Sequence, residues 1–243
     1  ELEQFAYVAS HDLQEPLRKI MAFGDRLQIG AGSLLDERSR DYLGRMLNAA
    51  QRMSGLINDL LAYSRITTKA QPFSPVNLAQ VVQEVLSDLE VAIEEAGARV
   101  EVGELPTIDA DPSQMRQLLQ NLIGNALKFR REGVPLVVLV ESQILQGVPY
   151  PGAGLRNMMQ LRVIDNGIGF EERFAERIFE VFERLHSREE YPGSGMGLAI
   201  CRKIVERHHG TITAASKPGE GSVFTVTMPV EQPRESTAPD DGP

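Results

Sequence analysis

The first 66 residues contain two long stretches in which apolar residues recur at alternating spacings of four and three. This periodicity is typical of helices that bury one side, and it limits the fold to a helical hairpin in this part of the chain. The segment Gly30–Ser33 separates the two stretches and suits a turn between helices, and the second stretch runs from about Leu35 to Arg65. The two apolar stripes are Leu2, Ala6, Ala9, Leu13, Pro16, Ile20, Phe23 and Leu27, and then Tyr42, Met46, Ala49, Met53, Leu56, Leu60 and Tyr63.

Two helices of this length bury too little apolar surface when they pair only with each other. Doubling the hairpin into a four-helix bundle would cover both stripes, so we expect a homodimer. The chain begins inside the first helical pattern, at Glu1, which suggests a fragment of a longer protein.

Composition narrows the class of protein. The 243 residues are enough for two modest domains. A formal net charge of −9, from 34 acidic and 25 basic residues, argues against a general nucleic-acid binder, which would need a basic surface. No run of about 18 apolar residues occurs, so we expect no membrane-spanning segment. Cys201 is the single cysteine, so no intramolecular disulfide can form, and a cytoplasmic setting fits.

The remainder of the sequence predicts a second domain of mixed helices and mostly antiparallel strands, an α/β sandwich. Helices are expected from Asn77 to Gly97, after the N-cap Asp111, and near Gly197–His208. Residues 68–77 contain two prolines and are expected to form a mobile linker. We therefore predict four parts, namely a helical domain at 1–67, the linker at 68–77, the sandwich at 78–230 and a disordered polar tail at 231–243.

His11 lies in the first predicted helix, within FAYVASHDLQEPLRKI. At about 100° per residue it projects about 180° from the middle of the buried stripe, so it is expected to face solvent. Asp12 could accept the proton of one ring nitrogen and leave the other nitrogen as a nucleophile. Pro16 removes a backbone donor and is expected to bend the helix beside His11. An ordinary surface histidine is the alternative.

A later helix carries QNLIGNALKFR, in which Asn121 and Asn125 are four residues apart and share one face. Amide oxygens can ligate Mg²⁺ without adding negative charge beside a phosphate, and Lys128 would supply positive charge there. An ordinary polar helix face is the alternative.

Two glycine-containing stretches also favour an anion site. VIDNGIGF follows a predicted strand and holds Asp165, Gly167 and Gly169. A carboxylate there could accept the exocyclic amine of adenine, and glycines allow close backbone approach, although an ordinary turn is the alternative. GSGMGLAI precedes a helix, as phosphate-binding backbone does, but it matches neither the Walker loop nor the dinucleotide fingerprint. Its three glycines are Gly193, Gly195 and Gly197.

In this order the motifs resemble those of sensor histidine kinases of two-component systems. FAYVASHDLQEPLRKI is similar to their phosphoacceptor box, and the later stretches resemble the N, G1, F and G2 boxes of the ATP-binding domain that these kinases share with gyrase, Hsp90 and MutL. The resemblance covers roughly residues 1–230, and the HDLQEPL form looks most like the kinases of phytochromes. It implies a phosphotransfer hairpin that dimerises into a four-helix bundle, followed by an α/β sandwich.

The resemblance also implies a reaction. ATP would phosphorylate His11, with Asp12 assisting, and the phosphoryl group would pass to an aspartate of a response regulator. An upstream sensor domain would supply the signal.

The nucleotide site that the resemblance implies uses Mg²⁺ on Asn125, with Asn121 and Lys128 near the phosphates. Asp165 is implied to bind adenine, and Arg184 to approach the γ-phosphate. The other implied nucleotide-binding residues are Phe129, Gly167, Gly169, Gly193, Gly195, Gly197 and Leu198.

Two positions depart from common family patterns. Related ATPases carry a water-activating glutamate four residues before the magnesium-binding asparagine, whereas this chain has Asn121 there. A neutral amide is not a general base, so attack of water on ATP should be slow and His11 is the expected acceptor. Glu15 stands where many members have the Thr or Asn that positions water for dephosphorylation, so we do not assume phosphatase activity.

Two other functions remain open. A non-catalytic dimeric module could bind nucleotide only as a conformational switch, and the full set of nucleotide motifs argues against this. An ATPase of the gyrase or Hsp90 kind would release phosphate repeatedly without His11, and Asn121 argues against that.

Overall fold

The computed structural model describes residues 2–150, 154–187, 190–191 and 193–232, with side chains from Leu13 onward in these ranges. It divides into two compact units, which are residues 1–70 with 180–200 and residues 71–179 with 201–243, and each unit is described by itself. No helix within the described ranges is both long and apolar enough to cross a membrane.

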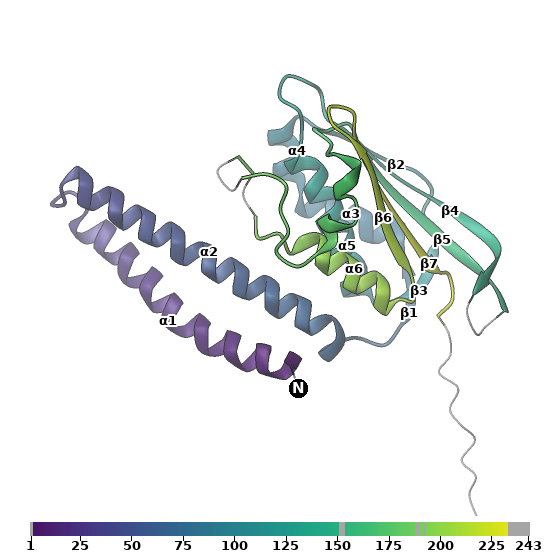
Figure 1. Cartoon of the computed structure of the whole chain (residues 1–243), viewed down its shortest axis with the longest axis horizontal. Coiled ribbons are helices and arrows are strands. Elements are labelled where there is room, and N and C mark those ends of the chain that lie inside the picture. Colours follow the sequence, from purple (N-terminus) through teal and green to yellow (C-terminus); the bar gives the residue numbers. More distant parts are fainter. Residues whose placement is uncertain (1, 151–153, 188–189, 192, 233–243) are drawn as a thin grey trace, which may run out of the picture. The chain divides into compact units, whose positions relative to one another are not determined.

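Helices α1 (Leu2–Ala31) and α2 (Glu37–Thr68) form the expected antiparallel hairpin (Figure 1). Asp36 caps α2, because its carboxylate accepts a hydrogen bond from the Ser39 N–H at 2.7 Å. The Arg40 guanidinium closes the turn by donating to the carbonyls of Gly32 and Leu35, at 3.2 and 3.1 Å.

The seam between α1 and α2 differs from the predicted stripe. Leu17 packs with Ala50, Ile57 and Leu61, all of which are buried, and Met21 packs against this cluster. None of these five residues belongs to the stripes that the apolar periodicity indicated.

Of the stripe residues whose side chains the structure describes, most are exposed in the single chain. The single hairpin leaves these side chains exposed, and their burial in a four-helix bundle stays a prediction. The stripe therefore remains available to another apolar surface. Its side chains that are 48 to 64% exposed are Leu13, Ile20, Phe23 and Leu27 on α1, and Tyr42, Met46 and Met53 on α2.

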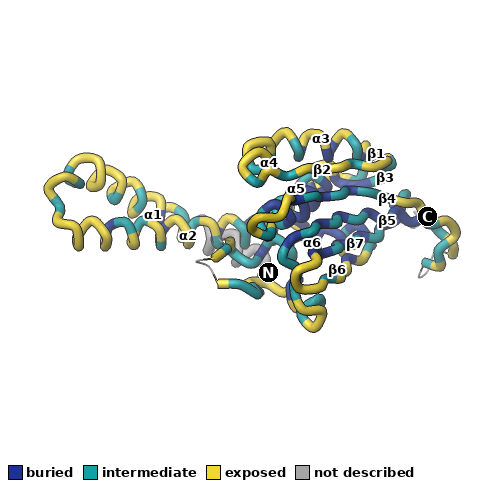
Figure 2. The backbone as a smooth tube through the Cα atoms, turned by 90° about the horizontal axis from the view of Figure 1, so that it is seen from above, coloured by how far each residue is buried: buried dark blue, intermediate teal, exposed yellow. Residues whose placement is uncertain are grey.

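The second unit contains a five-stranded sheet in the order β2-β4-β5-β7-β6, with β2 parallel to β4 and every other pair antiparallel. Helices cover one side of this sheet (Figures 1 and 2). The strands are β2 (Arg99–Val102), β4 (Val137–Tyr150), β5 (Gly154–Asp165), β6 (Thr211–Lys217) and β7 (Gly221–Pro229). The helices are α3 (Leu78–Asp88), α4 (Glu90–Ala96), α5 (Pro112–Lys128) and α6 (Gly197–Arg207), with 3₁₀ turns at Glu172–Phe174 and Arg177–Phe179.

The core lies between the sheet and the helices, as an α/β sandwich requires. Alternate strand residues are buried there, since successive side chains of a strand point to opposite faces. The other face of the sheet is more polar, and Arg162 pairs with Glu141 on the neighbouring strand at 2.9 Å. Fully buried core side chains include Val138, Val140, Val163, Val226, Leu118, Leu122 and Ile204.

Several element boundaries differ from the sequence-based expectation. The helix expected from Asn77 to Gly97 breaks at Leu89 into α3 and α4. A separate two-stranded sheet, β1 (Ser74–Asn77) with β3 (Thr107–Ala110), was not predicted, because four residues carry too little periodicity. Strand β1 occupies the end of the expected linker.

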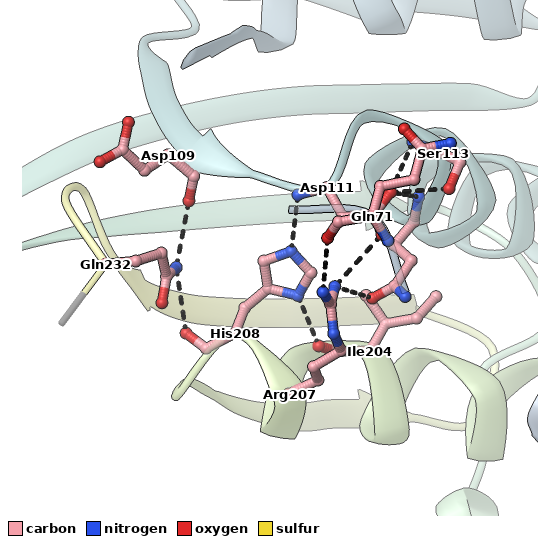
Figure 3. A network of polar contacts seen from close by, with 9 residues as sticks. Gln71, Asp109, Asp111, Ser113, Ile204, Arg207, His208 and Gln232 are labelled. Atoms are coloured by element: carbon pink, nitrogen blue, oxygen red, sulfur yellow. Dashed lines mark hydrogen bonds and ion pairs between the residues drawn. The ribbon is translucent and has the colours of Figure 1, made fainter. Parts of the chain in front are cut away.

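The C-terminal end of the sandwich extends past residue 230, where the polar tail was expected to begin. Gln232 is buried, and its amide donates to the carbonyls of Asp109 and His208 at 3.1 and 3.4 Å (Figure 3). Residues 233–243, which make up most of the predicted tail, lie outside the described residues.

His208 follows α6 and is fully buried as a neutral ring. Its Nε2 accepts a hydrogen bond from the Asp111 N–H at 3.0 Å, and its Nδ1 lies 2.7 Å from the Ile204 carbonyl, to which it donates (Figure 3). The negative end of a helix dipole favours a charged histidine. Burial outweighs this effect and lowers the pKa of His208 to about 4.

This buried histidine predicts acid sensitivity. The unfolded chain takes up a proton on His208 near pH 6.5, whereas the native chain excludes it down to about pH 4. The free energy of unfolding should therefore fall as pH falls through this window, by up to about 3 kcal/mol from this residue. Urea unfolding between about pH 7 and pH 5 should show a smaller acid-induced loss in His208→Gln than in the unmodified chain. An equal loss in both proteins would contradict the assignment.

Candidate functional site

Helix α5 has a buried apolar side and a half-buried polar side. Its apolar residues enter the core, whereas Asn121, Asn125 and Lys128 are half-buried. The Gln117 side-chain amide donates to the Asn121 carbonyl oxygen at 3.1 Å, which orients the Asn121 amide along the helix. The structure thus places the predicted amides and ammonium group on one side of one helix.

The loop after β5 is fastened to the end of α5. The Ile168 N–H donates to the Phe129 carbonyl at 2.9 Å. Gly167 lies so close to this carbonyl that a β-carbon would be 2.4 Å from its oxygen, so no other residue fits without moving the backbone. The contact brings the last turn of α5 together with the stretch Asp165–Gly169.

The turn between β6 and β7 supports this loop from the opposite side. The Gly219 N–H donates to the Ile168 carbonyl at 2.7 Å, and the Ser216 hydroxyl accepts from the Phe170 N–H at 2.9 Å. Sequence reasoning did not connect this turn to the site. Its stretch SKPGEGS indicates a tight turn, but nothing in the sequence indicates what the turn contacts.

Asp165 ends β5 as a buried carboxylate. It accepts a hydrogen bond from the Gly167 N–H at 2.8 Å. Burial raises the pKa of Asp165 above its usual value, and hydrogen bonds from the backbone of Gly167 and Ser222 partly oppose this rise. A carboxylate held in this way is an acceptor suited to an amine donor that enters with its own hydrogen atoms.

Arg184, which was predicted to approach a phosphate, lies in the other unit and contacts the backbone of residues that follow it in the chain. Its guanidinium donates to the Gly193 carbonyl, and to the carbonyls of Ser187 and Tyr191 at 3.2 and 2.7 Å. One side chain thus fixes three points of the backbone between residues 184 and 193.

The backbone conformation at Gly195 explains why a glycine stands there. Gly195 has a φ of 81°, and a β-carbon there would lie 2.7 Å from the Glu183 carbonyl oxygen. The Met196 N–H donates to the Ser194 hydroxyl at 3.2 Å just before α6 begins at Gly197. Gly197 and Leu198 are half-buried in the first turn of α6.

His11 and Asp12 lie in α1, but their side chains are outside the described residues. The solvent-facing orientation of His11 therefore stays a prediction, as does a bend at Pro16, through which α1 continues. About one turn after His11, the Gln14 side-chain amide donates a hydrogen bond to the side-chain oxygen of Asn58 on α2, at 2.7 Å. This bond connects the two helices at that point. Glu15 forms an ion pair with Lys19 at 2.8 Å.

The predicted site residues thus fall into three groups. The second unit brings together those on α5 and the loop fastened to it, and the arrangement of the other two groups around them stays a prediction. The groups are Asn121, Asn125, Lys128, Phe129, Asp165, Gly167 and Gly169; then Arg184, Gly193, Gly195, Gly197 and Leu198; and then His11 with Asp12.

Comparison with known proteins identifies two matching families. The His Kinase A (phospho-acceptor) domain matches residues 1–69, and the family of histidine kinase-, DNA gyrase B- and HSP90-like ATPases matches residues 110–232. The phytochrome-like protein Cph1 of Synechocystis sp. is 40% identical over 230 residues, which are 95% of this chain and 29% of Cph1. The sensor protein GacS of Pseudomonas syringae is 31% identical over 242 residues, which are 96% of this chain and 25% of GacS.

Solved structures agree with the sequence comparison. The crystal structure of full-length ShkA in complex with AMPPNP aligns with a TM-score of 0.69 and 25% identity, over 95% of this chain and 46% of ShkA. The chain therefore spans less than half the length of each of these three proteins. The helical hairpin, the sandwich and both matched families confirm the resemblance that the motifs indicated. The chain belongs to the sensor histidine kinases, with a phosphoacceptor hairpin followed by a histidine kinase-, gyrase- and Hsp90-like ATPase domain.

Proposed function

We propose that this chain uses ATP to phosphorylate its own His11 and then passes the phosphoryl group to an aspartate of a response-regulator receiver domain. The observation that carries the proposal is the polar side of α5. It offers the neutral amides of Asn121 and Asn125, and the sequence of α5 contains no Asp or Glu that could activate water. A bound phosphoryl donor then needs a nucleophile from elsewhere in the protein.

The described residues fit an adenine nucleotide. Asp165 would accept the exocyclic amine of adenine, and Gly167 belongs to the loop that holds this carboxylate, since its N–H donates to it at 2.8 Å. Phe129 would pack near the base, and the Lys128 ammonium group, 4.6 Å from the Phe129 ring centroid, would extend toward the phosphates. Gly169 belongs to the same loop.

The phosphate-binding part of the proposal draws on both units. Gly193, Gly195 and Gly197 precede or begin α6, where backbone N–H groups suit an anion, and Leu198 follows in the same turn. Arg184 would add positive charge near the γ-phosphate. The family match over residues 110–232 supports treating these residues as one site.

Asn125 is the proposed ligand of Mg²⁺, with Asn121 and Lys128 close to the phosphates. The fit rests on chemistry, since amide oxygens are hard ligands that add no negative charge. When bound, Mg²⁺ would neutralise charge on the phosphate oxygens.

The phosphoryl transfer would proceed as a direct displacement. One imidazole nitrogen of His11 attacks the γ-phosphorus while the bond from that phosphorus to the bridging oxygen breaks and ADP leaves. Asp12 accepts the proton of the other ring nitrogen. The P–N bond formed is labile, which suits onward transfer to an aspartate.

A homodimer completes the proposal. The exposed stripes on α1 and α2 have the heptad-like spacing of a four-helix bundle seam, and a second copy presents a matching stripe by symmetry. A cytoplasmic setting belongs to the same proposal, because ATP is the substrate. Nucleotide binding without catalysis and repeated ATP hydrolysis are the alternatives that experiments must exclude.

Labelling with γ-³²P ATP tests the autokinase proposal. The chain should acquire an acid-labile, alkali-stable label, and His11→Gln should abolish it because His11 is the proposed acceptor. His209→Asn, at the exposed histidine after α6, should label like the unmodified chain. Full labelling of His11→Gln would exclude the proposed acceptor.

Replacement of Asp165 tests the nucleotide site. Asp165→Asn should weaken binding of a fluorescent ATP analogue by at least about tenfold, because the amide presents a donor where the adenine amine needs an acceptor. Asp109→Asn, a half-buried carboxylate on β3, should bind normally. Unchanged affinity in Asp165→Asn with a native circular dichroism spectrum would remove adenine recognition from this residue.

A charge in the exposed stripe tests the dimer. Phe23 is 64% exposed in the single chain, and Phe23→Glu would place a carboxylate in the proposed bundle core. We expect the dissociation constant measured by analytical ultracentrifugation to rise by about 100-fold or more. Gln28→Glu adds the same charge on another side of α1 and should leave the dimer intact. A dimer of unchanged strength in Phe23→Glu would contradict the proposed seam.

A further inference from the structure

The middle of the expected linker is hydrogen-bonded to the sandwich (Figure 3). The Gln71 N–H donates to the Asp111 carboxylate at 2.8 Å, and the Arg207 guanidinium donates to the Gln71 carbonyl at 2.7 Å. Arg207 also lies over the ring of Phe73, 4.6 Å from its centroid, and the His208 ring lies 4.9 Å from the same centroid. The expectation of a mobile linker therefore does not hold from Gln71 onward.

We refer to Gln71, Phe73, Asp111 and Arg207 as the linker clasp. Its central member is Asp111, which is fully buried and ion-paired with Arg207 at 3.2 Å. Burial alone would raise the pKa of Asp111, but hydrogen bonds from Ser113, Gln71 and Gln114 and the charge of Arg207 outweigh it and lower the pKa. The carboxylate therefore stays ionised, as a permanent anchor for the chain.

Two features show that the clasp binds the backbone of Gln71 and not its side chain. Both hydrogen bonds to Gln71 use its N–H and C=O groups, and its side chain is exposed. Arg207 also donates to the Gln114 side chain at 2.9 Å, and this second bond orients the guanidinium toward the linker. Because both backbone groups of Gln71 are hydrogen-bonded, this segment should open less often than a surface linker without such bonds.

The clasp keeps the connection between α2 and the sandwich short. Helix α2 ends at Thr68, so only Lys69 and Ala70 lie between it and the first held residue. Three residue steps span at most about 10 Å, whereas release of the chain back to β1, at Ser74, would give six steps and about 21 Å. Doubling the reach enlarges the volume open to the tethered domain about eightfold, and the effective concentration of one domain at the other falls by roughly three- to eightfold.

We propose that the linker clasp positions the nucleotide-binding domain for transfer to His11 by keeping its connection to α2 two residues long. The inference rests on the proposed autokinase function and adds Arg207 and Asp111 to it as positioning residues. They act through the length of the linker and not through contact with nucleotide.

Two variants lengthen the connection by independent means. Arg207→Leu removes the donor to the Gln71 carbonyl while keeping an apolar side chain beside Phe73, and insertion of Gly-Ser-Gly after Ala70 lengthens the chain without touching the clasp. Asp111 is left intact because it also caps α5, where its carboxylate accepts from the N–H groups of Ser113 and Gln114. Gln71→Ala is the matched control, because it removes only the exposed side chain.

The experiment measures the rate of His11 labelling at saturating ATP, nucleotide affinity, and hydrogen exchange of residues 69–73 in the full chain. Both lengthened proteins should label roughly three- to eightfold more slowly, with nucleotide affinity within about twofold of normal. Exchange should increase in Arg207→Leu, and Gln71→Ala should match the unmodified chain in all three measurements.

The outcomes separate this inference from the function on which it rests. If the unmodified chain does not label on His11, the autokinase proposal fails and the inference falls with it. If it labels but the insertion variant labels at the same rate or faster, the positioning role is wrong while the autokinase proposal stands. Rapid exchange at residues 71–73 in the unmodified chain would show that the clasp does not form.

Discussion

The hydrogen bond from the Ile168 N–H to the Phe129 carbonyl joins two parts of the proposed nucleotide site. It fastens the loop after β5 to the last turn of α5, and the lack of a side chain at Gly167 is what allows the approach. The contact thus links the end of the helix that carries the amides to the loop that follows the buried carboxylate of Asp165. The lack of a side chain at Gly167 therefore helps to bring together the amides of α5 and Asp165, which are about 40 residues apart in the sequence.

The polar side of α5 contains no general base. Asn121 and Asn125 present neutral oxygens, and Asn121 is held by a second amide, that of Gln117. Such a face can organise a charged phosphate and a cation, but it cannot remove a proton from water. In the proposed reaction, the phosphoacceptor hairpin in the same chain would supply the nucleophile that this face lacks. The linker clasp would add to this arrangement, because it would limit the distance between the nucleotide-binding domain and the hairpin.

Sequence reasoning recovered those parts of the protein that depend on local chemistry. The cap at Asp111, the i to i+4 amides and the glycines beside Asp165 follow from backbone and ligand requirements that short motifs express. The hairpin seam did not follow, because periodicity finds an apolar stripe without saying which surface covers it, and Leu17 and Ile57 pair inside the chain while Phe23 does not. The clasp was equally hidden, since it bonds the backbone of Gln71 to residues 40 and 136 positions away.

The proposed reaction transfers the γ-phosphoryl group of ATP to His11 and not to water. Its most direct test is a phosphate balance in single-turnover reactions of the unmodified chain and of His11→Gln, both saturated with ATP. The account predicts that nearly all of the transferred phosphate in the unmodified chain is bound to protein, and that His11→Gln still binds ATP but releases free phosphate no faster than the unmodified chain. Steady, repeated release of free phosphate by His11→Gln would contradict it, because the pocket would then activate water by itself.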